Sequence, residues 1–268
     1  YLLWGGIYGI WRWHTGSMQM DFSTGIMSLY SIISMYINNR MEPIYWFFGP
    51  ILSIYLSMPL LSICFENKKN QNALKYAIIL GFITISFLPF SYNFFVSLLP
   101  NSSFGFWNSS WRLDILGGYL LFALLGYWAS IHSFSKKEQL ILYFSGGVCC
   151  LFRLFGMIYF FTLSGEKPEM FFDYLSFPSV IYALSIFVLF KSMNIREIKH
   201  KNIFSNLASS SFGIYLIHIL VLTMMEKIVF FRNNPYIWHF VTPIICYFLC
   251  AAIVLLVKKF PVICHIFP

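Results

Sequence analysis

Seven long stretches of the sequence are apolar, and six of them contain no Asp, Glu, Lys or Arg. The seventh, residues 140–164, contains one charged residue, Arg153. An α-helix of about 20 apolar residues crosses the hydrocarbon core of a bilayer, so each stretch is long enough to be a membrane span. The other six stretches are residues 44–65, 76–100, 115–131, 174–190, 207–225 and 235–257.

The composition agrees with this pattern, because only 10% of the 268 residues are charged and 59% are hydrophobic. Soluble domains contain about 25% charged residues, so a water-soluble globular protein is excluded. We predict an all-α protein, a polytopic transmembrane bundle of about eight helices that forms a single integral-membrane domain over residues 1–268. Its immediate partner is then the lipid bilayer. The net charge of +8 is interpreted as a sign of topology and not of nucleic-acid binding.

Three segments are less regular than the main spans. Residues 1–11 are apolar but cover only about half of a bilayer, so we expect the chain to start inside a spanning helix. Residues 21–37 are expected to form an interfacial helix with one apolar side. Residues 76–100 are longer than one straight span needs, and we expect that helix to end near residues 89–92, where Pro89 lies.

Basic residues concentrate in every second loop. Loops 66–75, 132–139 and 191–206, together with Lys258 and Lys259, carry eleven Lys and Arg residues, and the alternate segments carry fewer. Cytoplasmic loops of membrane proteins are enriched in these residues. We therefore expect the three basic loops and the C-terminus to face the cytoplasm.

Arg153 needs a physical reason, because a charge inside a membrane helix is costly and usually faces a partner or a polar cavity. It lies about 20 Å along its helix from the predicted cytoplasmic end, in the outer half of the span. Two interpretations stay open. Arg153 either snorkels or pairs with a carboxylate to hold helices together, or it contacts an anion or substrate in a polar cavity.

His218 is the second polar residue of interest. Tyr215 before it and Leu222 and Glu226 after it lie at helical spacings that place them on one face of the helix with His218. We expect this face to point into the bundle and to line a site. The alternative is a hydrogen-bonded histidine that serves packing alone.

Charged residues at the predicted outer boundary form a further group of candidates. Arg112 and Asp114 open one span, Glu226 closes another, and Arg12 follows the first apolar segment. They are either solvated anchors or contacts to a substrate at the external mouth. The six cysteines form no CxxC pair and lie mostly in apolar runs, so we predict no metal site.

Three segments carry a resemblance to a known family. The stretch SSSFGIYLIHILVL (209–222) resembles the Ser-Phe-Gly-Ile-Tyr-Leu-Ile-His signature near the end of the membrane acyltransferase-3 (O-acetyltransferase-like) family. The stretches IYWFFGPILSIYLSMPLL (44–61) and LSFPSVIYALSIFVLFK (175–191) are similar to two further patterns, the second from a subgroup of surface-polysaccharide O-acyltransferases. Order and spacing of the three agree with the family over essentially the whole chain.

The resemblance implies a bundle of about ten helices with both ends in the cytoplasm, so about two helices would be missing at the start. It implies a multi-pass protein of the bacterial inner membrane. The donor would be acyl-CoA, with acetyl-CoA as the first expectation, and the acceptor a hydroxyl of a cell-surface or lipid-linked saccharide. The family's hallmark Arg-x3-His lies in the first helix, which this chain would lack. Arg196 and His200 fit the same spacing in a basic loop, and we interpret that match as a coincidence.

Acyl transfer to a hydroxyl needs a general base and donors for the developing oxyanion. We therefore assign His218 and Arg153 as candidate catalytic residues, with Tyr215 beside His218 in the cavity. Substrate contacts are assigned to Arg12, Arg112, Asp114 and Glu226. Two other classes of protein fit the same spans: a transporter or flippase of a lipid-linked saccharide, and a membrane scaffold without catalysis. A transporter would move its substrate without changing the substrate's mass.

Overall fold

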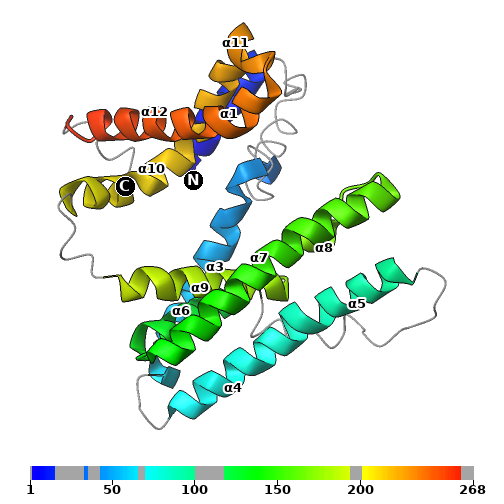
Figure 1. Cartoon of the computed structure of the whole chain (residues 1–268). Coiled ribbons are helices and arrows are strands. Elements are labelled where there is room, and N and C mark those ends of the chain that lie inside the picture. Colours follow the sequence, from blue (N-terminus) through cyan, green and yellow to red (C-terminus); the bar gives the residue numbers. More distant parts are fainter. Residues whose placement is uncertain are drawn as a thin grey trace. The chain divides into compact units, whose positions relative to one another are not determined.

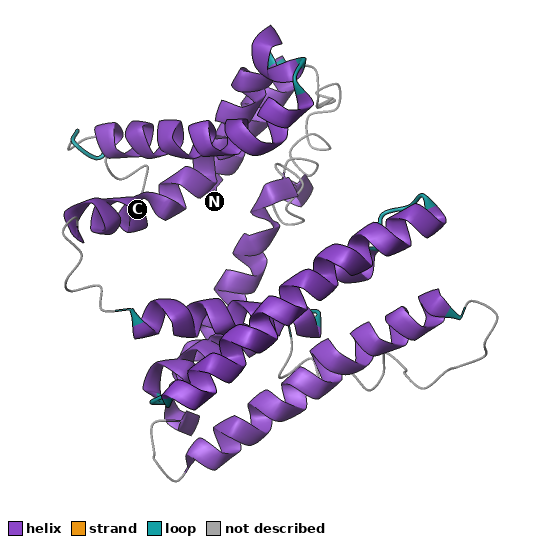
Figure 2. Ribbon diagram, viewed as in Figure 1, coloured by secondary structure: helices purple, strands orange, loops and turns teal. Residues whose placement is uncertain are grey.

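The computed structural model describes residues 2–15, 33–35, 43–65, 70–99, 118–193 and 201–260. Within these ranges every regular element is a helix (Figure 2). The chain divides into two compact units, Tyr1–Met193 and Asn194–Pro268. The expected interfacial helix lies outside the described residues except for the short helical piece 33–35.

Figure 1 shows the helices of both units, coloured along the chain. The first unit contains α1 (Leu2–His14), η1 (Pro43–Phe47), α3 (Phe48–Phe65), α4 (Gln71–Gly81), η3 (Phe82–Phe87), α5 (Leu88–Leu98), α6 (Leu120–Ile131), α7 (Lys136–Ser164), α8 (Glu169–Phe172) and α9 (Phe177–Ser192). The second unit contains α10 (Lys201–Glu226), α11 (Val229–Arg232), η7 (Ile237–Val241) and α12 (Thr242–Val257).

Among the described residues, five helical segments are long and apolar enough to cross a membrane. They are Gln71–Leu98, Lys136–Ser164, Glu169–Ser192, Phe204–Glu226 and Ile237–Val257. The helix α6 is apolar but shorter. The structure therefore confirms the predicted fold class, an all-α polytopic membrane bundle.

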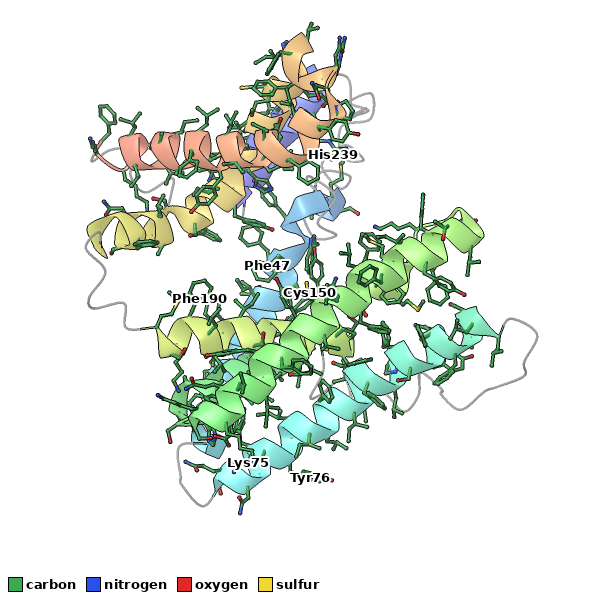
Figure 3. All side chains as sticks on the ribbon, viewed as in Figure 1. Phe47, Lys75, Tyr76, Cys150, Phe190 and His239 are labelled. Atoms are coloured by element: carbon green, nitrogen blue, oxygen red, sulfur yellow. The ribbon has the colours of Figure 1, made fainter. Side chains whose placement is uncertain are left out.

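The outward-facing side chains are those of a protein that faces lipid. On α7, Leu140, Phe144 and Phe155 have exposed fractions of 69%, 74% and 63%. Tyr76 on α4 and Phe190 on α9, both labelled in Figure 3, are also exposed. Apolar surface of this extent is unfavourable in water and compatible with the hydrocarbon of a bilayer.

The prediction that the helix ends near Pro89 is wrong, because the helix continues through α5 to Leu98. A proline lacks the N–H that would pair with a carbonyl one turn earlier, and its ring crowds that carbonyl. Here the π-helical segment η3 directly precedes the Leu88–Pro89 pair, and its wider turn accommodates the missing bond. The second unit repeats the arrangement, with π-helical η7 ahead of Pro243.

The core of the first unit has one aliphatic and one aromatic part. The aliphatic part lies between α4, α6 and α9 and contains Leu74, Ile78, Leu121, Leu124, Leu125 and Val180. The aromatic part joins α5, α7, α8 and α9 and contains Phe90, Phe94, Phe152, Phe160, Phe171 and Phe177. The helices α7 and α9 also contact each other directly, with Gly146 against Ser185. Small residues at such crossings allow membrane helices to approach closely.

The start of α7 and the end of α6 are both fixed by local hydrogen bonds. Ser135 and Glu138 form a capping box: the Ser135 Oγ accepts from the Glu138 N–H at 3.3 Å, and the Ser135 N–H donates to the Glu138 carboxylate at 2.7 Å. The Lys191 Nζ donates to three carbonyls at the end of α6, those of Ala129, Ser130 and His132, at 2.7–2.9 Å. A lysine therefore satisfies carbonyls that have no partner inside the helix.

Candidate functional site

His218 lies near the middle of α10, in the second unit, and its ring is held by its own helix. The Nδ1 atom lies 2.8 Å from the Tyr215 carbonyl oxygen. A carbonyl only accepts hydrogen bonds, so Nδ1 carries the proton in this contact. In the neutral ring the lone pair is then on Nε2, which is the atom able to accept a proton from a substrate. This contact favours the tautomer in which Nε2 is the proton acceptor.

The Tyr215 side chain lies beside this histidine. The two rings have centroids 5.9 Å apart and planes inclined by 33°. Both side chains are half-buried. Their proximity agrees with the expectation from helical spacing that they share one face.

The expectation that the whole His218 face points into the bundle holds only in part. The most buried line of α10 carries Ser210, Ile214, Ile217 and Met225, and His218 lies beside that line. Glu226 is exposed. Small and apolar side chains form the buried line because they pack without the desolvation cost of a carboxylate or an imidazole. The polar face therefore borders the core and remains reachable from outside it.

The helix α12 supports the backbone around His218. Cys246 Sγ donates to the His218 carbonyl oxygen at 3.6 Å and lies 3.8 Å from Cys250 Sγ. At the other end of the contact between α10 and α12, Lys258 Nζ donates to the Ser209 carbonyl at 2.9 Å. The contacts of α12 with α10 therefore include hydrogen bonds to two α10 carbonyls, those of Ser209 and His218.

Arg153 lies in the first unit, and its partner is a backbone carbonyl. Its Nε and Nη2 both donate to the Phe171 carbonyl oxygen, at 3.1 and 2.7 Å. No described residue pairs a carboxylate with Arg153, which instead contacts this backbone carbonyl. A buried carbonyl needs a donor, and the guanidinium supplies two N–H groups to one oxygen. The remaining N–H groups of Arg153 are left for another acceptor.

The contact of Arg153 positions the short helix α8 against α7. Phe171 is buried, and its ring lies against Gly156, where an added Cβ would collide with the ring. The same ring belongs to the aromatic core with Phe90 and Phe160. Arg153 therefore holds α8 against α7, the helix that carries Arg153.

The other predicted site residues lie in different places. Arg12 is in the last turn of α1, in the first unit. Arg112 and Asp114 lie outside the described residues. The structure thus brings Tyr215 and His218 together in one unit and places Arg153 and Arg12 in the other. The catalytic and substrate-binding roles of all these residues stay predictions.

Sequence reasoning missed a cluster at the basic-loop end of the first unit. The His132 ring stacks on Trp128 with centroids 4.9 Å apart, and its Nε2 lies 3.7 Å from a Glu138 carboxylate oxygen. The Ser-x-x-Glu spacing of the capping box at 135–138 was the signal in the sequence, because it fixes where α7 starts. The approach of His132 to that start depends on the fold of the loop. Among the described residues, no group of three or more His, Cys, Asp or Glu side chains has the arrangement of a metal site.

The fold and the polar residues together define a class, a helical membrane protein with ionisable side chains on its spanning helices. The comparison with known families assigns it further. The model of the acyltransferase-3 family, described as an acyltransferase domain, matches residues 1–258, and the chain belongs to this family. The match covers both compact units. No curated protein and no solved structure matches the chain.

Proposed function

We propose that the protein is an integral-membrane O-acyltransferase that transfers an acyl group, acetyl in the first instance, from acyl-CoA to a hydroxyl of a cell-surface or lipid-linked saccharide. The observation that carries this proposal is the match to the acyltransferase-3 family over residues 1–258. The basic loops support a cytoplasmic donor, because the phosphates of coenzyme A need cationic contacts. The proposed location is the bacterial inner membrane, with the C-terminus in the cytoplasm.

The proposed reaction uses His218 as the general base. Its Nε2 accepts the proton of the acceptor hydroxyl while the hydroxyl oxygen attacks the thioester carbonyl carbon. The bond from carbon to sulfur then breaks, the new ester forms, and the thiolate of coenzyme A leaves and takes up a proton. The hydrogen bond from Nδ1 to the Tyr215 carbonyl supports this role because it places the lone pair of the neutral ring on Nε2.

Arg153 is proposed to serve the same reaction from the outer side of the membrane. Two of its N–H groups are used by the Phe171 carbonyl, and the others are proposed to contact the developing oxyanion or an anionic group of the substrate. Tyr215 is proposed to contact substrate beside His218. Arg12, Arg112, Asp114 and Glu226 are proposed contacts of the acceptor saccharide at the external mouth.

Mass spectrometry of surface glycans, from cells with and without the full-length gene, tests the proposed function. We expect each modified sugar to lose the mass increment of one acyl group when the gene is deleted. A transporter or flippase gives a different result: the acyl groups stay on the glycans, and the amount or the chain length of the glycan falls. Glycans unchanged in mass, amount and length would contradict both functions.

A further inference from the structure

The first unit contains a cavity that none of the proposed catalytic residues lines. Its volume is about 530 Å³, and its walls come from α4, the end of α6 and the beginning of α7. Three ionisable side chains, Lys75, His132 and Glu138, line one part of it. Apolar side chains lie one helical turn further along each wall: Ile78, Ile79, Trp128, Ile141 and Leu142. The cavity is therefore amphipathic, with its polar end at the beginning of α4 and at residues 132–138.

The charges at the polar end are not equivalent. The Glu138 carboxylate accepts hydrogen bonds from the Ser135 N–H and Oγ at 2.7 and 2.8 Å and faces His132. Its negative charge is therefore stabilised by the hydrogen bonds and the helix dipole at the start of α7. Lys75 is exposed, and no described residue accepts a hydrogen bond from its Nζ. Lys75 is thus a cation that lines the cavity and has no carboxylate paired with it among the described residues.

Two of the isoleucines at the apolar end are exposed. Ile79 and Ile141 have exposed fractions of 58% and 57%, and both lie on segments long and apolar enough to span the membrane. Their exposed surfaces therefore face the hydrocarbon. Trp128 forms the inner wall and is half-buried. A molecule that diffuses within the bilayer can enter such a cavity directly, with its head kept at the level of the basic loops.

We propose that this cavity binds one anionic phospholipid from the leaflet at the basic-loop end. The phosphate contacts Lys75, and one acyl chain lies along Ile78, Ile79 and Ile141. Charge complementarity selects an anionic head, and the exposed apolar end selects a lipid over a soluble phosphate ester. The proposal is independent of acyl transfer, and its test measures lipid binding alone.

The experiment is native mass spectrometry of the full-length protein in detergent, titrated with phosphatidylglycerol and, separately, with zwitterionic phosphatidylcholine. We expect one phosphatidylglycerol to bind more tightly than phosphatidylcholine. Removing one lysine near a membrane surface costs about 1 kcal/mol in attraction to anionic lipid, so Lys75→Gln should weaken phosphatidylglycerol binding about fivefold. The matched control is Lys259→Gln, an exposed lysine at the end of α12 on the same predicted membrane side, which should leave binding unchanged.

A second variant tests the apolar end. Ile79→Trp fills the cavity from an exposed position, so it should abolish the tightly bound lipid while the melting temperature stays that of the wild type. Equal binding of phosphatidylglycerol by Lys75→Gln and Lys259→Gln would overturn the proposal, and so would equal affinity for the two lipids. A competition experiment with acyl-CoA gives a third outcome that would overturn the proposal. If acyl-CoA displaces the lipid one for one, and Lys75→Gln weakens that displacement, the cavity is a donor site.

Discussion

The contact of Gly146 with Ser185 makes a quantitative prediction about packing between α7 and α9. A Cβ added at Gly146 overlaps the Ser185 side chain, whereas a Cβ added at the neighbouring Gly147 meets no atom within 4 Å. Both glycines lie inside α7, so an alanine gains the same helix propensity, about 1 kcal/mol, at either position. The difference between Gly146→Ala and Gly147→Ala therefore isolates the collision, and overpacking of this kind costs about 1–3 kcal/mol.

The assay is unfolding of the full-length protein in mixed micelles, with the free energy of unfolding compared among the variants. We expect Gly146→Ala to be less stable than Gly147→Ala by about 1–3 kcal/mol. Ser185→Gly removes the atoms that the new methyl group meets, so in that background the two alanine variants should have the same effect. Equal stability of the two variants in the wild-type background would refute the reasoning. A difference that persists in the Ser185→Gly background would refute the assigned partner.

Three further predictions concern single side chains. His218→Ala should lower acyl transfer by about 10²–10⁴-fold at unchanged protein abundance. The control His239→Ala changes an exposed histidine of the same unit and should leave acyl transfer unchanged. Equal activities of the two variants would reduce His218 to a packing role. Arg153→Met leaves the Phe171 carbonyl without its donor and should lower the free energy of unfolding by about 1–3 kcal/mol. Arg153→Lys keeps a donor and should lose only part of that stability. Unchanged stability of the Met variant would contradict the contact. Lys191→Met should destabilise the protein by about 1 kcal/mol through the carbonyls at the end of α6, whereas Lys137→Met should be neutral; equal effects would argue against that cap.

The sequence was sufficient for those features that depend on local pattern. An uncharged apolar run must pair its backbone groups internally in a bilayer, so runs such as 207–225 and 235–257 could only be helices. The neighbourhood of Tyr215 and His218 followed from helical spacing alone. The path of the helix around Pro89 could not be predicted, because two outcomes were open: ending the helix, or inserting a π-helical turn ahead of the proline.

Contacts between distant segments were beyond the sequence. Nothing in the pattern around Arg153 indicated that its acceptor would be a backbone carbonyl 18 residues further along the chain. The stacking of His132 on Trp128 and its approach to Glu138 depend on the loop between α6 and α7. A carbonyl acceptor is present at every residue and leaves no signature in the side-chain sequence.

Acyl transfer by the purified full-length protein tests the central claim most directly. The protein is reconstituted into liposomes, supplied with acyl-CoA carrying a labelled acyl group and with the glycan from the deletion strain, and the label on the glycan is counted over time. We expect transfer of the label by the wild type, release of free coenzyme A in equal amount, and loss of both with His218→Ala. Glycan that crosses the membrane without gaining label would contradict the account and favour transport.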